Sequence, residues 1–422
     1  MRLLLLCPHF TPDLHAATGE VMTKLVEALA RRNHQITVVT SLPWYQHHDV
    51  DPAWRGRPWR VERTAWGRVV RVWPFPTDKT NIAARAVGFG GLTSLVTAAA
   101  LTQGRHDVVL GMSPPPFLGD AAWIAARRWR APMVFNTQDI FPDVAIDLGA
   151  LSNRRMVELA KRHERSLYRR ADAVTVLSRD QADNVAAKLP ADQRDKVVII
   201  HNFVDLDRIE VVERENGYRR RHQLTGKTVV MYSGNVGLSQ SFDLVRAAAV
   251  AWRHRPDVQF VINGEGAARP EVDRWAAELP NVTVADFAPR AEVSDVLGAA
   301  DVHLILLKRG LARSSTPSKL YANLASGRAI LASIDEGSEV ATTMARAGAG
   351  LAVPPEAPDA FLSALASLLD DPVQRELMGK RGRSYVEEWL TPDQQAVRYE
   401  QVFERLVAGD PIDPSDPDRA LQ

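Results

Sequence analysis

The sequence has almost no cysteine and no long apolar run at its start. Cys7 is the only cysteine among 422 residues, so no internal disulfide can form and nothing indicates an oxidising compartment. The first apolar run ends at Pro8, short of the ~7–15 apolar residues that a secretory signal contains. No group of Cys and His has the spacing of a zinc site. We therefore expect a cytoplasmic protein.

The composition is that of an ordinary globular protein, with 45% hydrophobic and 24% charged residues. This excludes disordered, collagen-like and disulfide-scaffold classes, and the length indicates two or three domains at ~100–200 residues each. The charge is uneven. Residues 1–200 carry 27 Lys/Arg and 19 Asp/Glu, net +8, whereas residues 201–422 carry 25 and 32, net −7. A basic half suits nucleic acid, an anionic membrane or a phosphorylated substrate, or it merely solvates helix faces.

Short apolar runs alternate with helical patterns along most of the chain. In the first half these runs are Arg2–Cys7, Gln35–Thr40, Asp107–Gly111, Pro132–Asn136, Asp172–Leu177 and Val197–Ile200. In the second half they are Thr228–Tyr232, Val258–Ile262, Val282–Asp286, Val302–Leu307, Ala329–Ser333 and Gly350–Val353. Strands that alternate with helices predict parallel sheets covered on both faces. We expect two doubly wound α/β domains.

An apolar stretch of 20 residues, Ile82–Leu101, follows a segment in which arginines alternate with tryptophans. The arginines are at positions 55, 57, 60, 63, 68 and 71, and the tryptophans at 54, 59, 66 and 73. Cations beside tryptophans suit a membrane interface. A core helix preceded by an arginine-rich hairpin is an alternative interpretation. A transmembrane span is the third, opposed by Arg85 and three glycines.

Glycine-bearing loops follow the first predicted strand of each half, where open α/β sheets bind ligands. Gly19 stands at the predicted start of a helix, whose free N–H groups favour an anion. The second loop, Ser233–Gly237, contains two glycines that would let a diphosphate approach the backbone. Neither loop matches G-x-G-x-x-G or a Walker sequence, and an ordinary turn is the alternative for each.

Three further positions are candidates for ligand chemistry. Ser318 can cap a helix whose first turn contains Lys319, a cation that opposes the helix dipole unless an anion is bound. Asp139 follows a predicted strand, so it could orient or deprotonate a hydroxyl, or cap the next segment. Asp205 and Asp207 have the spacing of a divalent-metal motif of some sugar transferases, but an interdomain turn explains them better.

Seven sequence motifs together resemble the GT-B glycosyltransferases of family 4, in particular the bacterial subfamily that builds surface and capsular polysaccharides. They span residues 1 to about 408: Pro8–Asp13 with Gly19-Glu20, Gln138–Asp143, Leu167–Asp172, Asn202–Asp205, Tyr232–Gly237, Ala300–Val302 and Pro317–Tyr321. The resemblance implies two facing Rossmann-like domains and a C-terminal helix that returns to the first. The expected extents are 1–203 for the acceptor domain, 204–390 for the donor domain, 391–408 for the helix and 409–422 for a disordered tail.

The resemblance also implies a reaction: retaining transfer of a sugar from a nucleoside diphosphate donor, expected to be a UDP-sugar, without metal or cofactor. Lys319 is a candidate catalytic residue by similarity, and Asp139 is the other candidate because of its place after a strand. The donor-binding candidates are Gly19, Gly234, Asn235, Gly237, Gly264, Gly266, Phe287, Ser318 and Lys319. The candidates on the acceptor side are His9, Glu20 and Gln138.

This sequence departs from the family pattern at several positions. Asn235 and Gln240 stand where the wider family has an arginine and a lysine, which leaves phosphate binding to the backbone and Lys319. The paired glutamates of the family fall at Ser314 and Ala322, and the second of them is expected to bind ribose. The family histidine of the first domain has no counterpart near Ser113.

We therefore expect a glycosyltransferase at the inner face of an anionic membrane that adds one sugar to a lipid-linked or other acceptor, with no nucleic-acid partner. The alternatives are a catalytically lapsed sugar-nucleotide or glycan-binding subunit and a natural-product glycosyltransferase. A sugar-nucleotide epimerase is a further alternative, although its cleft acid/base groups are not found.

Overall fold

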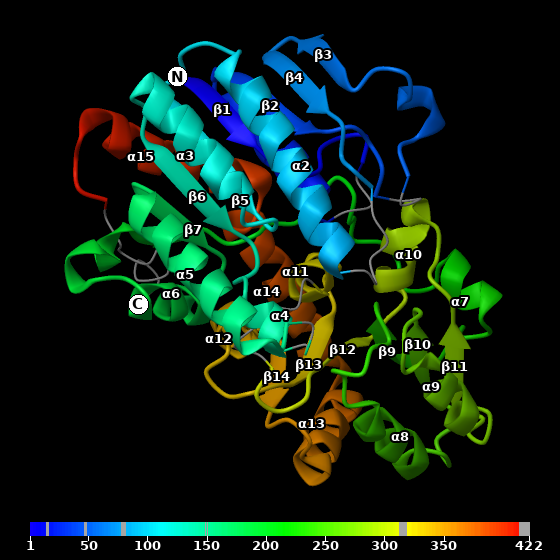
Figure 1. The fold of residues 1–422 in the computed structure, drawn as a ribbon. Coiled ribbons are helices and arrows are strands. Elements are labelled where there is room, and N and C mark those ends of the chain that lie inside the picture. The colour runs from blue at the N-terminus through cyan, green and yellow to red at the C-terminus, as the bar shows by residue number, and fades with distance from the viewer. Residues whose placement is uncertain are drawn as a thin grey trace. The chain divides into compact units, whose positions relative to one another are not determined.

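The fold is taken from a computed structural model that describes residues 1–13, 17–45, 49–76, 82–147, 149, 151–311 and 319–412. The chain divides into two compact units (Figure 1). Unit 1 contains Met1–Asn202 and Pro392–Gln422, and unit 2 contains Phe203–Thr391. The C-terminal helix therefore belongs to unit 1, as expected.

Unit 1 is built on a sheet of eight strands in the order β3-β4-β2-β1-β5-β6-β7-β8. The strands are β1 (Arg2–Leu6), β2 (Gln35–Ser41), β3 (Trp59–Thr64), β4 (Gly67–Val72), β5 (Val108–Ser113), β6 (Met133–Thr137), β7 (Ala173–Val176) and β8 (Val197–Ile199). Only the β3–β4 pair is antiparallel. The central strands are apolar runs buried on both faces, as parallel sheets require.

The helices of unit 1 cover both faces of this sheet. They are α1 (Ala17–Arg31), α2 (Ile82–Leu101), α3 (Leu118–Trp129), α4 (Asp143–Asp147), α5 (Arg154–Arg170), α6 (Arg179–Ala187) and α15 (Pro392–Ala408). Helix α2 lies against α3 over β2 and β4, and α1 lies against α15 (Figure 1). The inner side of α2, with Leu92 and Val96, is part of the core.

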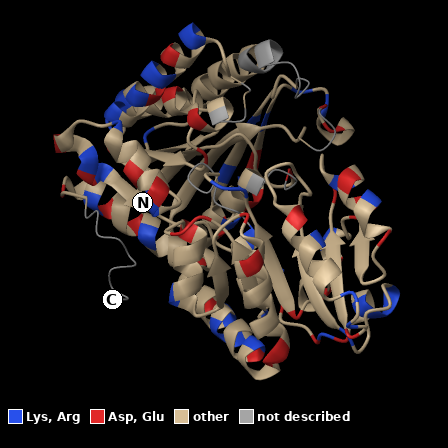
Figure 2. Cartoon of the chain, turned by 90° about the horizontal axis from the view of Figure 1, so that it is seen from below, with Lys and Arg blue, Asp and Glu red and all other residues tan. Residues whose placement is uncertain are grey.

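Unit 2 is built on a six-stranded, wholly parallel sheet in the order β11-β10-β9-β12-β13-β14. The strands are β9 (Thr228–Ser233), β10 (Val258–Asn263), β11 (Val282–Ala285), β12 (Val302–Leu306), β13 (Ala329–Ser333) and β14 (Gly350–Val353). Register is set by pairs such as Phe260 with Val230. Figure 2 shows the strands of both sheets largely free of charged residues, which lie mainly on the helices and loops.

The helices of unit 2 bury two apolar layers against its sheet. They are α7 (Gly217–Arg221), α8 (Phe242–Ala251), α9 (Arg269–Ala276), α10 (Val293–Gly298), α11 (Lys319–Ala325), α12 (Glu339–Ala347), α13 (Pro358–Asp370) and α14 (Pro372–Trp389). Helices α8, α9 and α13 share one core with the sheet, around Phe260 and Phe361. Helices α11, α12 and α14 share the other, around Leu324 and Val386.

These arrangements confirm the prediction of two doubly wound α/β domains. Every strand expected from the sequence is present, and its ends agree to within about two residues. No described helix is long and apolar enough to cross a membrane. The apolar stretch Ile82–Leu101 forms α2, which packs on the sheet as a core helix.

The arginine- and tryptophan-rich segment forms the β3–β4 hairpin at the edge of the unit 1 sheet. Arg71 is buried, bonds the Glu62 carboxylate at 2.6 Å and lies 4.9 Å from the centre of the Trp54 ring. Arg60 lies 5.2 Å from the same ring. Arg60 and Arg71 are therefore held by contacts within this segment, while Arg57 and Arg63 are exposed.

The strand orders place the first loop of each unit at a topological switch point. In unit 1, β1 lies between β2 and β5, and in unit 2, β9 lies between β10 and β12. Consecutive connections therefore leave these central strands in opposite directions, which opens a crevice at the carboxyl ends of the strands. The loops after β1 and β9 are the places where a ligand can reach backbone N–H groups.

Candidate nucleotide-sugar site

The candidate site in unit 2 begins with two glycine loops that lie side by side. The loop after β9 and the loop after β10 are joined by hydrogen bonds from the Gly234 N–H to the Asn263 carbonyl (2.9 Å) and from the Val236 N–H to the Glu265 carbonyl (2.7 Å). Gly264 has φ +150°, and a Cβ there would overlap the Gly234 carbonyl. Only glycine allows this close approach, so the backbones of the two loops pack directly against each other.

Lys319 covers the first of these loops from the start of α11. Its side chain lies over Gly234, where the methyl group of an alanine would overlap it. The Lys319 Nζ lies 4.0 Å from the centre of the Tyr232 ring and donates a hydrogen bond to the Tyr232 hydroxyl. Burial lowers the pKa of Lys319 to about 8. Within the described part of the chain no carboxylate pairs with this amine, so an anion at the loop would be its natural partner.

Two further hydrogen bonds within unit 2 hold this loop in place. The Gly237 N–H donates to the Gln240 side-chain oxygen at 2.8 Å. The Lys308 N–H, just after β12, donates to the Ser239 carbonyl at 2.9 Å, so the loops after β9 and β12 are joined as well. Gln240, which stands where the wider family has a lysine, thus stabilises the loop instead of presenting a charge.

The other donor-side candidates have different positions. Asn235 is exposed at the tip of the β9 loop, and Gly266 lies next to it with φ +151°. Phe287 is 53% exposed and follows β11 at the same edge of the sheet. Ala322 is three residues beyond Lys319 on α11, which places both on one side of that helix. Ser318 and Ser314 lie outside the described residues.

In unit 1 the loop after β1 brings three of the predicted residues together. The His9 Nδ1 and an Asp13 oxygen are 3.1 Å apart, and a Cβ on Gly19 would overlap the Asp13 carbonyl. Burial alone would raise the pKa of Asp13, but hydrogen bonds from His9 and from the Trp44 and Tyr45 N–H groups keep it below its usual value. Glu20 is half-buried in the first turn of α1.

The motif after β6 divides into a buried and an exposed part. Gln138 is buried, and its amide is held at both ends, donating to the Asn136 oxygen at 2.9 Å and accepting from the Asn202 amide at 2.9 Å. Asn136 in turn donates to the Tyr399 hydroxyl of α15 at 2.7 Å. Gln138 therefore shapes the carboxyl edge of this sheet from inside, whereas Asp139 is exposed there.

The Asp205 and Asp207 pair forms a turn, in which the Asp207 N–H donates to an Asp205 oxygen at 3.2 Å. No cluster of three or more metal-ligating side chains was found among the residues that the structure describes. Tyr232 is the member of the unit 2 site that sequence reasoning missed as a site residue. Its burial and its contact with Lys319 depend on how β9 and α11 pack, which no sequence spacing reveals.

Comparison with known proteins agrees with this arrangement. Residues 17–202 match the glycosyl transferase 4-like domain family, and residues 227–371 match the glycosyl transferases group 1 family. A colanic acid biosynthesis glycosyl transferase of Escherichia coli, WcaI, is 26% identical over 338 residues, which cover 78% of this chain and 82% of WcaI.

Two solved structures with low sequence identity share the fold. Sucrose-phosphate synthase of Thermosynechococcus elongatus superposes with a TM-score of 0.71 at 18% identity, covering 97% of this chain and all of that one. The Anabaena protein HepE, solved with UDP, has a TM-score of 0.66 at 12% identity and covers 96% of this chain and all of its own. With both halves of the chain matched and the two-sheet fold shared, this protein belongs to the GT-B glycosyltransferases of the family 4 type.

Proposed function

We propose that this glycosyltransferase moves a sugar from a nucleoside diphosphate donor, a UDP-sugar, to a hydroxyl of a lipid-linked or other glycan acceptor, with retention of the anomeric configuration and without a catalytic metal. The observation that carries the proposal is Lys319: a half-buried amine with a lowered pKa, set over a glycine loop at the switch point of unit 2. The relationship to WcaI, named for colanic acid biosynthesis, supports a glycan acceptor. The UDP bound by HepE supports a UDP-sugar donor.

The chemistry follows from where charge develops. When the bond between the sugar and the diphosphate breaks, negative charge grows on the departing phosphate oxygen. A cation and fixed backbone dipoles at that point stabilise the transition state more than the bound donor. Lys319 would supply the cation and the Gly234 loop the close backbone approach. Phe287 and the Gly264–Gly266 loop would border the base.

On the acceptor side, Asp139 would orient or deprotonate the attacking hydroxyl. Its exposed position at the carboxyl end of β6 favours this role over that of Gln138, whose amide groups are both bonded within unit 1. His9 and Glu20, beside Gly19, would contact the incoming substrate from the loop after β1. We infer a cytoplasmic enzyme at an anionic membrane surface, and the net charge of +8 in residues 1–200 supports that part of the proposal.

The first experiment is a panel of nucleotide-sugars incubated with the full-length enzyme, with and without lipid-linked acceptors. At least one donor is expected to support transfer or slow hydrolysis, in the presence of EDTA as well as in its absence. The anomeric configuration of the product, read by proton NMR, tests retention. Failure of every donor both to react and to raise the melting temperature would overturn the proposal.

Lys319→Gln is the variant that tests the site itself. Losing the cation at the leaving group is expected to lower kcat by roughly a hundredfold. Lys227→Gln is the matched control, since Lys227 precedes β9 at the opposite edge of the same sheet and bonds Gln259 at 2.9 Å. Equal activity of the two variants would contradict the assignment of Lys319.

Ala322 motivates the second candidate function, a sugar-nucleotide-binding subunit that no longer catalyses transfer. The family glutamate at this place is expected to bind ribose, and an alanine has no group that can do so. Donor binding without turnover, unchanged in Ala322→Glu, would favour this candidate. Turnover by the natural chain would remove it.

A further inference from the structure

A basic cavity lies at the edge of the unit 2 sheet opposite the glycine loops. It has a volume of about 570 Å³ and is lined by Val211, Val212, Glu213, Arg214, Asp301, Gly327, Arg328, Ala329, Arg375, Glu376, Lys380, Arg383 and Ser384. Asp301 directly precedes β12 and Ala329 opens β13, so the cavity is at the amino ends of these strands. Strands of this length separate the two edges by roughly 17–20 Å, and the cavity is therefore distinct from the donor site.

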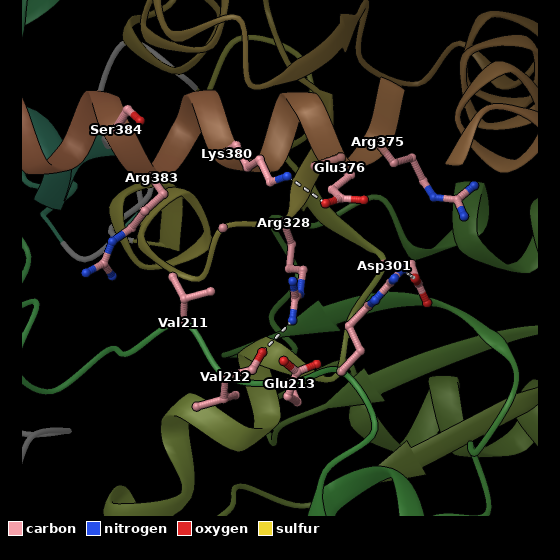
Figure 3. A pocket seen from close by; sticks show the side chains of 13 residues that line it. Val211, Val212, Glu213, Asp301, Arg328, Arg375, Glu376, Lys380, Arg383 and Ser384 are labelled. Atoms are coloured by element: carbon pink, nitrogen blue, oxygen red, sulfur yellow. Dashed lines mark hydrogen bonds and ion pairs between the residues drawn. The ribbon is translucent and has the colours of Figure 1, made fainter. Parts of the chain in front are cut away.

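Positive charge exceeds negative charge in this lining, with five Lys/Arg side chains against three carboxylates. Two of the carboxylates are already neutralised. Asp301 accepts from Arg214 at 2.7 Å, from Arg219 at 2.6 Å and from a backbone N–H at 2.8 Å. Glu376 pairs with Lys380 at 2.7 Å on α14, as Figure 3 shows.

Arg383 pairs with Glu387 at 2.6 Å, which leaves Arg328 and Arg375 as the remaining cations of the lining. Arg328 donates to the carbonyls of Val212 and Gly298, and in Figure 3 its guanidinium points toward Val212. Arg375 is 8% exposed and donates to the carbonyls of Leu368 and Leu369. Among the described residues, no carboxylate forms an ion pair with either guanidinium.

The backbone contacts fix these two groups in place before any ligand arrives. Gly298 is the last residue of α10, and Leu368 and Leu369 lie in the last turn of α13, so each arginine holds carbonyls at a helix C-terminus. Burial lowers the pKa of both guanidinium groups, while the nearby charge of Asp301 raises each pKa and that of Arg214 lowers it. An anion in the cavity would further stabilise the charged form of both groups.

We propose that this cavity is a second ligand site of the protein, which binds a small molecule through a phosphate group. The planar guanidinium suits phosphate because its N–H groups can bond two oxygens at once. The volume lies within the ~300–1,000 Å³ of small-molecule pockets. Glu213, exposed at the rim, is available to hydroxyl groups of the same ligand.

The test uses the full chain with inorganic phosphate and with glucose 6-phosphate as probes. Binding is followed by the melting temperature and by the phosphorus NMR line width. The pocket variant is Arg214→Gln/Lys380→Glu, which changes exposed side chains and makes the cavity more negative by three charges. The matched control is Arg246→Gln/Arg274→Glu, with the same charge change on exposed residues of α8 and α9 outside the cavity.

Both probes are expected to bind the natural chain and the control variant, and to bind the pocket variant roughly tenfold more weakly, because a lining that is more negative by three charges repels an anion. Lys319→Gln separates this site from the donor site and should leave the binding unchanged. Binding that disappears in Lys319→Gln but persists in the pocket variant would place the phosphate at the glycine loops and overturn the proposal. Absence of binding to the natural chain would overturn it as well, whatever the donor panel shows.

Discussion

The amine of Lys319 and the ring of Tyr232 form one unit, with Nζ 4.0 Å from the ring centre and bonded to the hydroxyl. The Tyr232 hydroxyl donates onward to the Asn235 carbonyl at 2.6 Å, so it links the cation to the glycine loop. Tyr232→Phe keeps the ring and removes this link. We expect kcat/KM for the donor to fall by roughly tenfold, the value of about one hydrogen bond to a charged group.

Tyr218→Phe is the control for this prediction. The Tyr218 hydroxyl is also buried in unit 2 and bonds the Asn263 side chain at 2.9 Å, without contact to Lys319. Both variants are expected to lose about 1 kcal/mol of unfolding free energy, because each loses one buried hydrogen bond. If donor kcat/KM falls by the same factor in both variants, Tyr232 acts only through stability and does not position Lys319.

The pH dependence of donor use should report the lowered pKa of Lys319, which is about 8 instead of the ordinary 10.5. In the free enzyme the amine loses its charge as pH rises through 8, so donor kcat/KM is expected to decline above that pH. Lys319→Arg should move the decline to higher pH because a guanidinium stays charged. A profile of kcat/KM that remains flat to about pH 10 would contradict this assignment.

The lowered pKa of Lys319 should raise the stability of the ligand-free protein with pH, whereas it lowers donor use. Between pH 8 and 10.5 the unfolded chain binds more protons at Lys319 than the folded chain does. The contribution of this residue to the unfolding free energy therefore rises with pH in that window. Denaturant unfolding of the natural chain and of Lys319→Gln at both ends of the window measures the difference.

A methyl group added at Gly264 is expected to disrupt the packing of the two donor loops. Its φ of +150° is strained for any other residue, and the added Cβ would overlap the Gly234 carbonyl. Gly264→Ala is expected to cost more than about 2 kcal/mol of unfolding free energy and to abolish donor binding. Denaturant titration and the donor-induced rise in melting temperature are the measurements.

Gly226→Ala is the control that separates the cost of a positive φ from the cost of a steric overlap. Gly226 also has positive φ, +73°, but nothing lies within 4 Å of the place where its Cβ would be. This variant should cost only about 1 kcal/mol, the penalty for the left-handed region, and should bind donor normally. Equal costs for the two glycines would mean that the two loops are not packed as described.

His303 is expected to make unit 2 sensitive to acid. It is fully buried in β12, and burial lowers its pKa to about 4 from 6.5. Between these pH values the unfolded chain binds more protons at His303, so stability falls as pH falls, by about 2 kcal/mol at pH 4.5. His303→Gln, which can still donate toward the Leu297 carbonyl, should remove this loss. His254→Gln, at an exposed histidine, should keep it.

The fold could be predicted because its signal is local. Buried parallel strands such as β1 and β10 are short apolar runs, and the helices between them carry their own periodicity. The order of the strands is not local, and the contact between the Gly234 and Gly264 loops depends on it. The two glycine loops could be located from the sequence, but their hydrogen bonds to each other could not.

Side-chain roles were the least predictable part of the site. Gln138 and Asp139 both follow the same strand, and the sequence does not show which of the two side chains is buried. Its bond to Asn202, 64 residues away, holds it inside unit 1. The basic cavity has the same origin: Arg214, Arg328 and Arg375 come from three distant segments that only the folded sheet edge brings together.

Helix α15 completes unit 1 from a segment that follows all of unit 2 in the sequence. Its Glu400 pairs with His34 at 2.8 Å, its Asp393 with Arg31 at 2.7 Å, and its Tyr399 accepts the bond from Asn136. Unit 1 therefore lacks part of its fold until residues 392–408 have been synthesised, whereas unit 2 ends at residue 391. A fragment that ends near residue 202 would lack α15 and would expose the surface of α1 on which it packs, so we expect this fragment to aggregate more readily than the full chain.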